Sequence, residues 1–216
     1  MCYNFITVYS LFYVILFAMN NNTIYGDAYP EMERVLKNTV AFINGLRQGL
    51  TPIFNDDPVE HLSYRIKSDS SMREKCRRKG LPETEESALS VLSDAIGIRI
   101  VCAFRSDVYL IRDLIVQNED FTIVEEKDYI KNAKPNGYRS YHMIIKNEGF
   151  FIELQLRTIS MDTWAALEHQ IKYKKKVGKS LSLITSELKR CADELASTDI
   201  SMQTIRDMIR KMEDEN

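Results

Sequence analysis

Residues 141–158 read YHMIIKNEGFFIELQLRT, and this stretch decides the fold. From Phe150 to Thr158 apolar and polar side chains alternate, which is the two-residue period of a strand with one buried face. The apolar set is Ile152, Leu154 and Leu156, and the polar set is Glu153, Gln155 and Arg157. Asn147 to Gly149 has the residues of a tight turn, so the stretch predicts a hairpin of strands Tyr141–Lys146 and Phe150–Thr158.

Other segments supply the rest of the sheet. The β-branched run Ile96–Phe104 predicts a buried central strand. Alternation predicts a strand at Val59–Ser68, and a further strand is expected at Phe121–Glu126. Apolar residues at helical spacing and helix start and stop signals predict the helices. These are Pro30–Gln48, Ser70–Lys79, Glu85–Ser93, a helix from the N-cap Ser106 through Asn118, Asp162–Lys176, and Leu181 to the C-terminus. The sequence therefore predicts an α/β (α+β) domain with a mixed central sheet flanked by helices and a C-terminal helical extension.

The chain of 216 residues suits one domain with an appended helical segment. Its first 26 residues carry no charged side chain, and Phe5–Met19 is an almost unbroken apolar run, slightly short for a bilayer-spanning helix. We favour the interpretation that Met19 is the true start and that residues 1–18 are a spurious extension; a membrane anchor is the alternative. The main domain is then expected at residues 19–178, with C-terminal helices at 179–216.

Charge and cysteine usage exclude several classes of function. The chain has 29 Lys and Arg against 31 Asp and Glu, so it has no broad electrostatic attraction to DNA or to an acidic membrane. Four scattered cysteines without CxxC pairing and three histidines cannot form the usual zinc spacing. We read these as ordinary thiols of a reducing compartment and expect a cytoplasmic protein.

Cationic side chains are concentrated on one predicted strand and the helix after it. Arg65 and Lys67 lie two residues apart in the strand, which places them on one side of the sheet. In the next helix Ser71, Lys75, Arg78 and Lys79 share one face. Such a surface can neutralise a triphosphate, although a solvated basic helix is the simpler alternative.

Two carboxylates and one further cation are unusual for their positions. Asp94 directly precedes the central strand, and Arg99 interrupts it, where an unpaired charge would be costly. Glu153 lies on the polar side of the hairpin strand. If the two strands are neighbours, Asp94 and Glu153 together with phosphate oxygens can hold Mg²⁺.

The segment KNAKPNGYRSYH, residues 131–142, combines turn residues with an aromatic and a histidine. Tyr138 could stack on a base, with Lys134 and His142 as phosphate-binding donors beside it. A plain turn is the alternative. We interpret Trp164 as a core residue and His169 as structural or exposed.

Five segments in order resemble the successive motifs of the RelA/SpoT-type synthetase domain family. They are YRIKSDSSMREKCRR (64–78), DAIGIRI (94–100), KDYIKNAKPNGYRSYH (127–142), IELQLRT (152–158) and WAALEHQIKYK (164–174). Ordered motifs are far more specific than any one of them alone. Because the chain shows no hydrolase motif or regulatory tail, it is most similar to the free-standing small alarmone synthetases. These are GTP pyrophosphokinases, which transfer the β,γ-pyrophosphate of ATP to the 3′-hydroxyl of GTP or GDP to make (p)ppGpp in the stringent response.

The resemblance implies a nucleotidyltransferase-like fold and a role for each matching residue. It implies an ATP site of Arg65, Lys67, Ser71, Lys75, Arg78 and Arg99, with the first and last of these on either side of the adenine. It implies a GTP/GDP site of Lys127, Lys134, Asn136, Tyr138, His142 and Gln155. Asp94 and Glu153 would bind Mg²⁺, and Glu153 would also accept the proton of the 3′-hydroxyl. The family further implies a homotetramer assembled through the C-terminal helices. The sequence EEKD at Glu125–Asp128 lacks an arginine of the pattern, which leaves the choice between GDP and GTP open.

Two other functions share many of these features. A toxin-type relative would pyrophosphorylate the 3′ end of tRNA, and the lysines between Lys172 and Lys176 could serve such a partner. A nucleotide- or RNA-binding regulator could keep the fold without turnover, although it would have little use for both carboxylates. RNA as a regulator of an active enzyme is a further expectation that the sequence leaves open.

Overall fold

The computed structural model describes residues 23–54, 57–173 and 181–215. The apolar segment 1–18 and the lysines at 174–176 lie outside the described residues. The elements in chain order are η1 (Gly26–Ala28), α2 (Tyr29–Phe54), β1 (Val59–Ile66), α3 (Asp69–Lys79), η2 (Ser87–Val91), β2 (Ile96–Cys102), α4 (Arg105–Val116), β3 (Thr122–Asp128), β4 (Tyr141–Asn147), β5 (Phe150–Thr158), α5 (Ile159–Tyr173) and α6 (Leu181–Asp214). Over the described ranges none of the helices combines the length and hydrophobicity needed to cross a bilayer.

The sheet has five strands in the order β1-β2-β5-β4-β3. The central pair β2 and β5 is parallel, whereas β1–β2, β4–β5 and β3–β4 are antiparallel, so the predicted mixed sheet is confirmed. The β4–β5 hairpin turns through Glu148 and Gly149, which both have positive φ (48° and 89°). This is the backbone of a two-residue turn that matches the twist of a hairpin.

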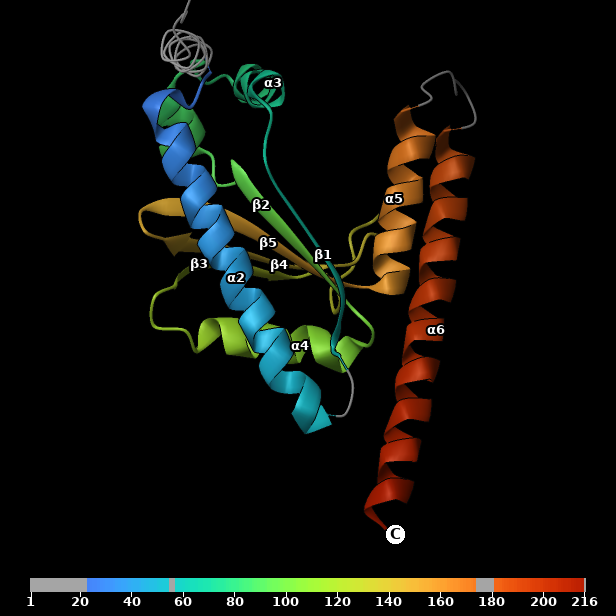
Figure 1. The fold of residues 1–216 in the computed structure, drawn as a ribbon. Helices are drawn as coiled ribbons and strands as arrows, with labels where there is room; N and C mark the ends of the chain where they lie inside the picture. The colour runs from blue at the N-terminus through green and yellow to red at the C-terminus, as the bar shows by residue number, and fades with distance from the viewer. Residues whose placement is uncertain (1–22, 55–56, 174–180, 216) are drawn as a thin grey trace, which may run out of the picture.

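One apolar core lies between the sheet and two helices, α2 and α4 (Figure 1). Ile98 of β2 pairs with Leu154 of β5, and Met143 of β4 pairs with Leu154 from the other side. These three side chains are at most 2% exposed, and buried residues of both helices belong to the same cluster. Because side chains alternate along a strand, the polar residues between them face the other side of the sheet.

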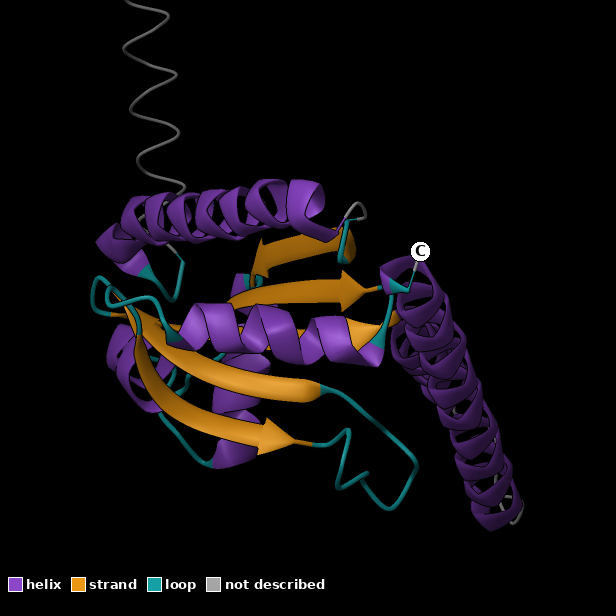
Figure 2. Cartoon of the chain, turned by 90° about the horizontal axis from the view of Figure 1, so that it is seen from below, coloured by secondary structure: helices purple, strands orange, loops and turns teal. Residues whose placement is uncertain are grey.

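The helices α5 and α6 pack together at one end of the sheet, and α6 extends well beyond it (Figures 1 and 2). Thr158 at the end of β5 donates a hydrogen bond to Asp199 of α6 at 2.5 Å. Arg206 of α6 pairs with Asp107 of α4 at 2.8 Å, and both side chains are nearly buried. These contacts fix the C-terminal extension to the domain.

Several boundaries differ from the sequence-based expectation. The strand β1 ends at Ile66, so Lys67 follows the strand instead of lying on it with Arg65. The helix expected over Glu85–Ser93 forms, but it is shorter, and its residues Ser87–Val91 (η2) are a π-helix. The helix after β2 is capped at Phe104, not at Ser106, because the Asp107 carboxylate accepts a hydrogen bond from the Phe104 amide at 3.1 Å.

Two predictions on the C-terminal part agree with the structure. Trp164 is 5% exposed, and its indole N–H donates to the carbonyl of Leu188 in α6 at 2.8 Å. His169 is exposed on α5. Trp164 is therefore a core residue that also joins the two C-terminal helices.

Candidate active site

The register of the sheet brings most of the predicted site residues to one face. Gln155 of β5 lies opposite Arg99 of β2 on one side and opposite His142 of β4 on the other, and His142 lies opposite Lys127 of β3. In the neighbouring row Gly97 lies between Arg65 and Glu153. Residues directly opposite each other in a sheet project to the same face. The face that carries these polar side chains is opposite the apolar core.

Two cavities open on this face. The first cavity has a volume of about 290 Å³ and is lined from β1, β2 and β5 by Ser63, Tyr64, Arg65, Gly97, Ile98, Arg99, Glu153 and Gln155. The second cavity, of about 400 Å³, is lined by polar residues that include Lys75, Lys79, Asp94, Glu125, Lys127, Tyr129, Lys134, His142 and Glu153. Of the described residues, Glu153 alone lines both cavities.

Gly97 leaves open space in the floor of the first cavity. A Cβ atom placed on Gly97 would have no heavy atom within 4 Å beyond its chain neighbours. Its sheet partners are Arg65 and Glu153, and Arg99 follows two residues later on the same face. The missing side chain therefore leaves room for a flat group between two guanidinium ions.

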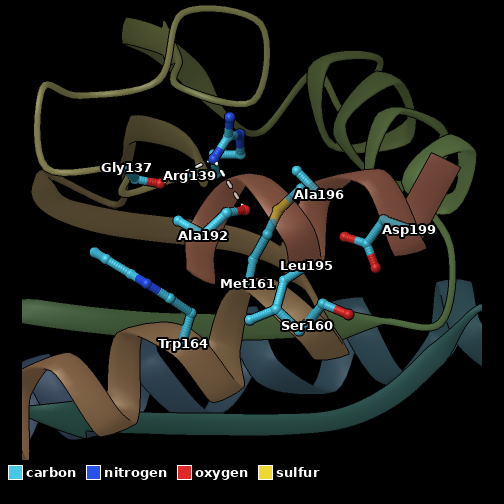
Figure 3. A pocket seen from close by; sticks show the side chains of 9 residues that line it. All are labelled: Gly137, Arg139, Ser160, Met161, Trp164, Ala192, Leu195, Ala196 and Asp199. Atoms are coloured by element: carbon cyan, nitrogen blue, oxygen red, sulfur yellow. Dashed lines mark hydrogen bonds between the residues drawn. The ribbon is translucent and has the colours of Figure 1, made fainter. Parts of the chain in front are cut away.

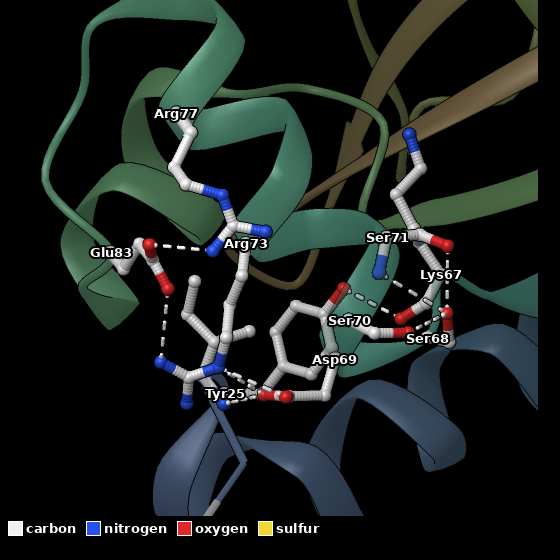
Figure 4. Close-up of polar contacts among 10 residues, drawn as sticks. Tyr25, Lys67, Ser68, Asp69, Ser70, Ser71, Arg73, Arg77 and Glu83 are labelled. Atoms are coloured by element: carbon white, nitrogen blue, oxygen red, sulfur yellow. Dashed lines mark hydrogen bonds and ion pairs between the residues drawn. The ribbon is translucent and has the colours of Figure 1, made fainter.

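The start of α3 is anchored by a polar network that orients its cations (Figure 4). Ser68 caps the helix, and Asp69 accepts hydrogen bonds from Arg73 at 2.9–3.0 Å. The Tyr25 hydroxyl donates to the carbonyl of Lys67 at 2.7 Å. Ser71 and Arg78 remain exposed on this helix. The N-terminal segment thus fixes the residue that leads from β1 into the basic helix.

Asp94 lies between two predicted phosphate ligands. Its Oδ2 atom forms ion pairs with Lys67 and with Lys75, the latter at 2.5 Å. Burial disfavours its ionised form, but the hydrogen bonds and charges of the two lysines outweigh burial and lower the pKa of Asp94. Among the described residues, its buried Oδ1 atom has no hydrogen-bond partner. An ionised carboxylate with one unused buried oxygen is suited to a cation.

Glu153 is held by its strand neighbour. Gln155 donates a hydrogen bond to Glu153 Oε2 at 2.9 Å, and the Nδ1 atom of His142 lies 3.8 Å from Oε1. Burial, followed by the charges of Arg157, Lys134 and Lys127, lowers the pKa of His142 to about 3. His142 is therefore neutral at pH 7, and its contact with Glu153 is not an ion pair.

The buried neutral histidine predicts how stability depends on pH. Its pKa is about 3 in the folded chain against an ordinary value of 6.5, so below pH 6.5 the unfolded chain binds a proton that the folded chain does not. The free energy of unfolding should therefore fall as pH is lowered from 6.5 toward 5. In His142→Gln this decrease should be weaker, as measured by urea denaturation at pH 7 and pH 5. Equal decreases in both proteins would contradict the assignment.

The loop between β3 and β4 carries the remaining predicted acceptor residues. Lys134 Nζ lies 4.4 Å from the ring centre of Tyr129 and 4.9 Å from that of Tyr138. The Tyr138 hydroxyl is 2.7 Å from His142 Nε2, and Asn136 donates to Glu168 of α5 at 3.1 Å. Lys134 and His142 line the second cavity with Tyr129, whereas Asn136 and Tyr138 are not among the described residues that line it. The aromatic residue that lines this cavity is thus Tyr129, which sequence reasoning did not single out.

The C-terminal helices hold this loop in place (Figure 3). Arg139 donates to Asp193 at 2.8 Å and to the carbonyl of Ala192 at 3.2 Å, both on α6. Gly137 has φ +92°, and a Cβ there would lie 2.6 Å from the Ala192 side chain. A side chain at this position is excluded by both conformation and space.

The sequence did not indicate two further residues of the candidate active site. Arg157 was recognised from the alternation as polar, but its side chain is only 5% exposed and contacts both Tyr138 and Gln155. Asp162 was read as the start of a helix, yet it pairs with Arg99 and Arg157. Residue spacing gives no signal for contacts between a strand and the helix that follows it.

Cationic side chains surround two adjoining cavities, and the carboxylates of Asp94, Glu125 and Glu153 lie in the wall of the second; this arrangement defines a class of protein. This class is a transferase domain that binds two nucleotide-like anions. Among the described residues no group of three or more metal-ligating side chains forms a complete metal site. A cation bound here would share its ligands with phosphate oxygens.

The comparisons with known proteins agree with this class. Residues 64–178 match the region found in RelA / SpoT proteins. GTP pyrophosphokinase YwaC of Bacillus subtilis is 42% identical over 164 residues, covering 71% of this chain and 77% of the relative. GTP pyrophosphokinase YjbM of the same organism is 32% identical over 168 residues, covering 73% and 78%.

Solved structures give the same result. The crystal structure of small alarmone synthetase 2 from Bacillus subtilis superposes with a TM-score of 0.72 at 36% identity, covering 82% of this chain and 96% of that one. Small alarmone synthetase 1 from Bacillus subtilis, bound to its product pppGpp, has a TM-score of 0.73 at 28% identity and covers 85% and 99%. The chain belongs to the RelA/SpoT family, and within it is similar to the small alarmone synthetases.

Proposed function

We propose that the chain is a GTP pyrophosphokinase that transfers the β,γ-pyrophosphate of ATP to the 3′-hydroxyl of GTP or GDP and so makes (p)ppGpp. The position of Glu153 at the junction of the two cavities carries this proposal. A transfer between two bound nucleotides needs both reacting groups to meet at one point. The names of the relatives, GTP pyrophosphokinases and alarmone synthetases, support the same reaction.

The first cavity is the donor site in this proposal. Arg65 and Arg99 bind the adenine of ATP on its two faces, over the open space at Gly97. The triphosphate then extends toward α3, where Lys67, Ser71, Lys75 and Arg78 bind it. Lys75 lines the second cavity, and Lys67 is held beside it by its ion pair with Asp94.

The second cavity is the acceptor site. Lys127, Lys134 and His142 line it and bind the guanine nucleotide, and Gln155, which lines the first cavity, holds Glu153 beside the reacting hydroxyl. Neutral His142 can donate or accept a hydrogen bond to a base or a ribose. Tyr138 and Asn136 support this site from the loop, and Tyr129 supplies an aromatic face within the cavity.

The two carboxylates fit a Mg²⁺ ion, because Asp94 has a free buried oxygen and both groups line the second cavity. When bound, Mg²⁺ neutralises negative charge on the transferred phosphates. Glu153 accepts the proton of the 3′-hydroxyl as that oxygen attacks the β-phosphorus of ATP, and AMP leaves. Lys67 and Lys75 stabilise the charge that develops on the phosphate oxygens.

The reaction is tested by incubating the purified protein with radiolabelled ATP and GDP, GTP or bulk tRNA in parallel. We expect labelled ppGpp or pppGpp from the free nucleotides. Label transferred only to tRNA would establish the toxin-type reaction instead. Nucleotide binding without transfer to any acceptor would establish a regulator and contradict the proposal.

Gly97 gives a specific test of the donor site. Replacing Gly97 with Val should raise the KM for ATP by at least about tenfold, since the added side chain occupies the space proposed for the adenine. The fold should be retained because valine suits a strand and meets no neighbour. Steady-state kinetics with each substrate varied separately measures the effect. A KM for ATP that stays unchanged in the folded variant would place the base elsewhere.

We also propose a cytoplasmic homotetramer assembled through α6. Ile205, Met208 and Ile209 share one side of this helix and are 50–54% exposed, which is costly for a solitary helix. Light scattering after size-exclusion chromatography should give the mass of an oligomer for the native chain. The double variant Met208→Lys/Ile209→Lys should give a smaller species, while Glu194→Lys on the same helix should not. A native protein that is monomeric at micromolar concentration would contradict this assembly.

A further inference from the structure

Asp162, at the start of α5, contacts arginines that belong to different parts of the site. Its Oδ1 atom lies 3.2 Å from Arg99 Nη1 and 2.9 Å from Arg157 Nη1. Its Oδ2 atom lies 3.8 Å from Nε2 of the exposed His61. The Asp162 side chain is 17% exposed and that of Arg157 is 5% exposed, so this pair is largely shielded from water, whereas Arg99 is 40% exposed.

The two arginines connect Asp162 to the lining of both cavities. Arg99 lines the first cavity directly. Arg157 donates through Nη2 to the Tyr138 hydroxyl at 2.7 Å and to Gln155 Oε1 at 2.8 Å. Tyr138 in turn contacts His142, which lines the second cavity. One carboxylate is therefore connected to both cavities through an ion pair with Arg99 and through the hydrogen bonds of Arg157.

The charge of Asp162 is needed to keep the two arginines in this arrangement. Two guanidinium ions that share one neighbour would repel each other without an anion between them. Among the described residues, the Nε atoms of both Arg99 and Arg157 are buried without a hydrogen-bond partner. Their Nη contacts with Asp162 therefore contribute strongly to the orientation of both side chains.

We infer that Asp162 is a positioning residue shared by the two nucleotide sites. It aims Arg99 at the donor base, and through Arg157 it fixes Tyr138 beside the acceptor and Gln155 beside Glu153 at the junction of the two cavities. The inference rests on the proposed function for the identity of the two nucleotides. It adds a residue of α5 that touches neither substrate but determines the affinity for both.

The test is the variant Asp162→Asn, which keeps the size of the side chain and removes its charge. We expect the KM for ATP and the KM for GTP each to rise about tenfold, with a smaller change in kcat. Equilibrium binding of a non-hydrolysable ATP analogue and of GTP should weaken in parallel. The matched control is Asp107→Asn, which breaks a comparably buried Asp–Arg pair with Arg206, away from both cavities, and should leave both KM values unchanged.

The outcomes separate this inference from the proposed function. Native protein that binds both nucleotides without transferring pyrophosphate would overturn the function alone. Unchanged affinities in Asp162→Asn, a change for ATP only, or equal changes in Asp107→Asn would overturn the shared positioning role. Native protein that binds neither nucleotide would overturn both.

Discussion

Replacing Glu153 with Gln should lower kcat for pyrophosphate transfer by about 10²–10⁴-fold while the protein remains folded. Gln keeps the shape of the side chain and can still contact Gln155, but it lacks the charge and the basicity of a carboxylate. His142 lies 3.8 Å from Glu153, but its pKa of about 3 makes it too weak a base to replace the carboxylate as proton acceptor. Because Glu153 lies where the two cavities join, losing its basicity should affect the chemical step more than either substrate affinity.

The experiment measures initial rates with saturating ATP and GTP or GDP, together with thermal unfolding. Glu148→Gln is the matched control, since Glu148 lies in the turn of the same hairpin, forms an exposed ion pair with Arg34 and lines neither of the two cavities. We expect near-normal turnover in the control. Near-normal turnover in a well-folded Glu153→Gln protein would reduce Glu153 to a polar strand residue.

Replacing Asp94 with Asn should be similarly inactivating, for a different reason. The change removes the anion that holds Lys67 and Lys75, and it removes a ligand proposed for Mg²⁺. We expect kcat at physiological Mg²⁺ to fall at least about 100-fold, through loss of charge stabilisation in the transition state. The lysines remain available to phosphate, so raising the Mg²⁺ concentration should restore part of the activity.

A Mg²⁺ titration of both variants distinguishes the two roles. Asp94→Asn should recover more activity at high Mg²⁺ than Glu153→Gln, because the second variant also lacks the base. Thermal unfolding controls for the lost ion pairs of Asp94. Identical Mg²⁺ responses in the two variants would contradict a metal-binding role that is separate from catalysis.

The sequence alone was sufficient to predict the strands of the sheet, because the alternation of apolar and polar residues in a strand is a local pattern. The alternation along Phe150–Thr158 predicted which side chains face the core, and the register confirms that Glu153 and Gln155 lie on the polar face. Helix ends were less predictable. Ser106 has the chemistry of an N-cap, but the carboxylate of Asp107 bonds the Phe104 amide and so places the cap two residues earlier. Which of two neighbouring residues caps a helix depends on the local backbone geometry, which cannot be read from the residue types alone.

For the candidate site, too, some features follow from the sequence and others only from the tertiary structure. By itself the sequence determined the family, the strands and the residue types that bind phosphate, since motif order and strand period are properties of the chain alone. Only the tertiary structure decided that Asp94 lies between two lysines, that Tyr129 and not Tyr138 lines the second cavity, and that Asp162 joins Arg99 to Arg157. These are contacts between side chains on different elements. They depend on how the elements pack, because burial determines which charged side chains must pair and which side chains can still point into a cavity.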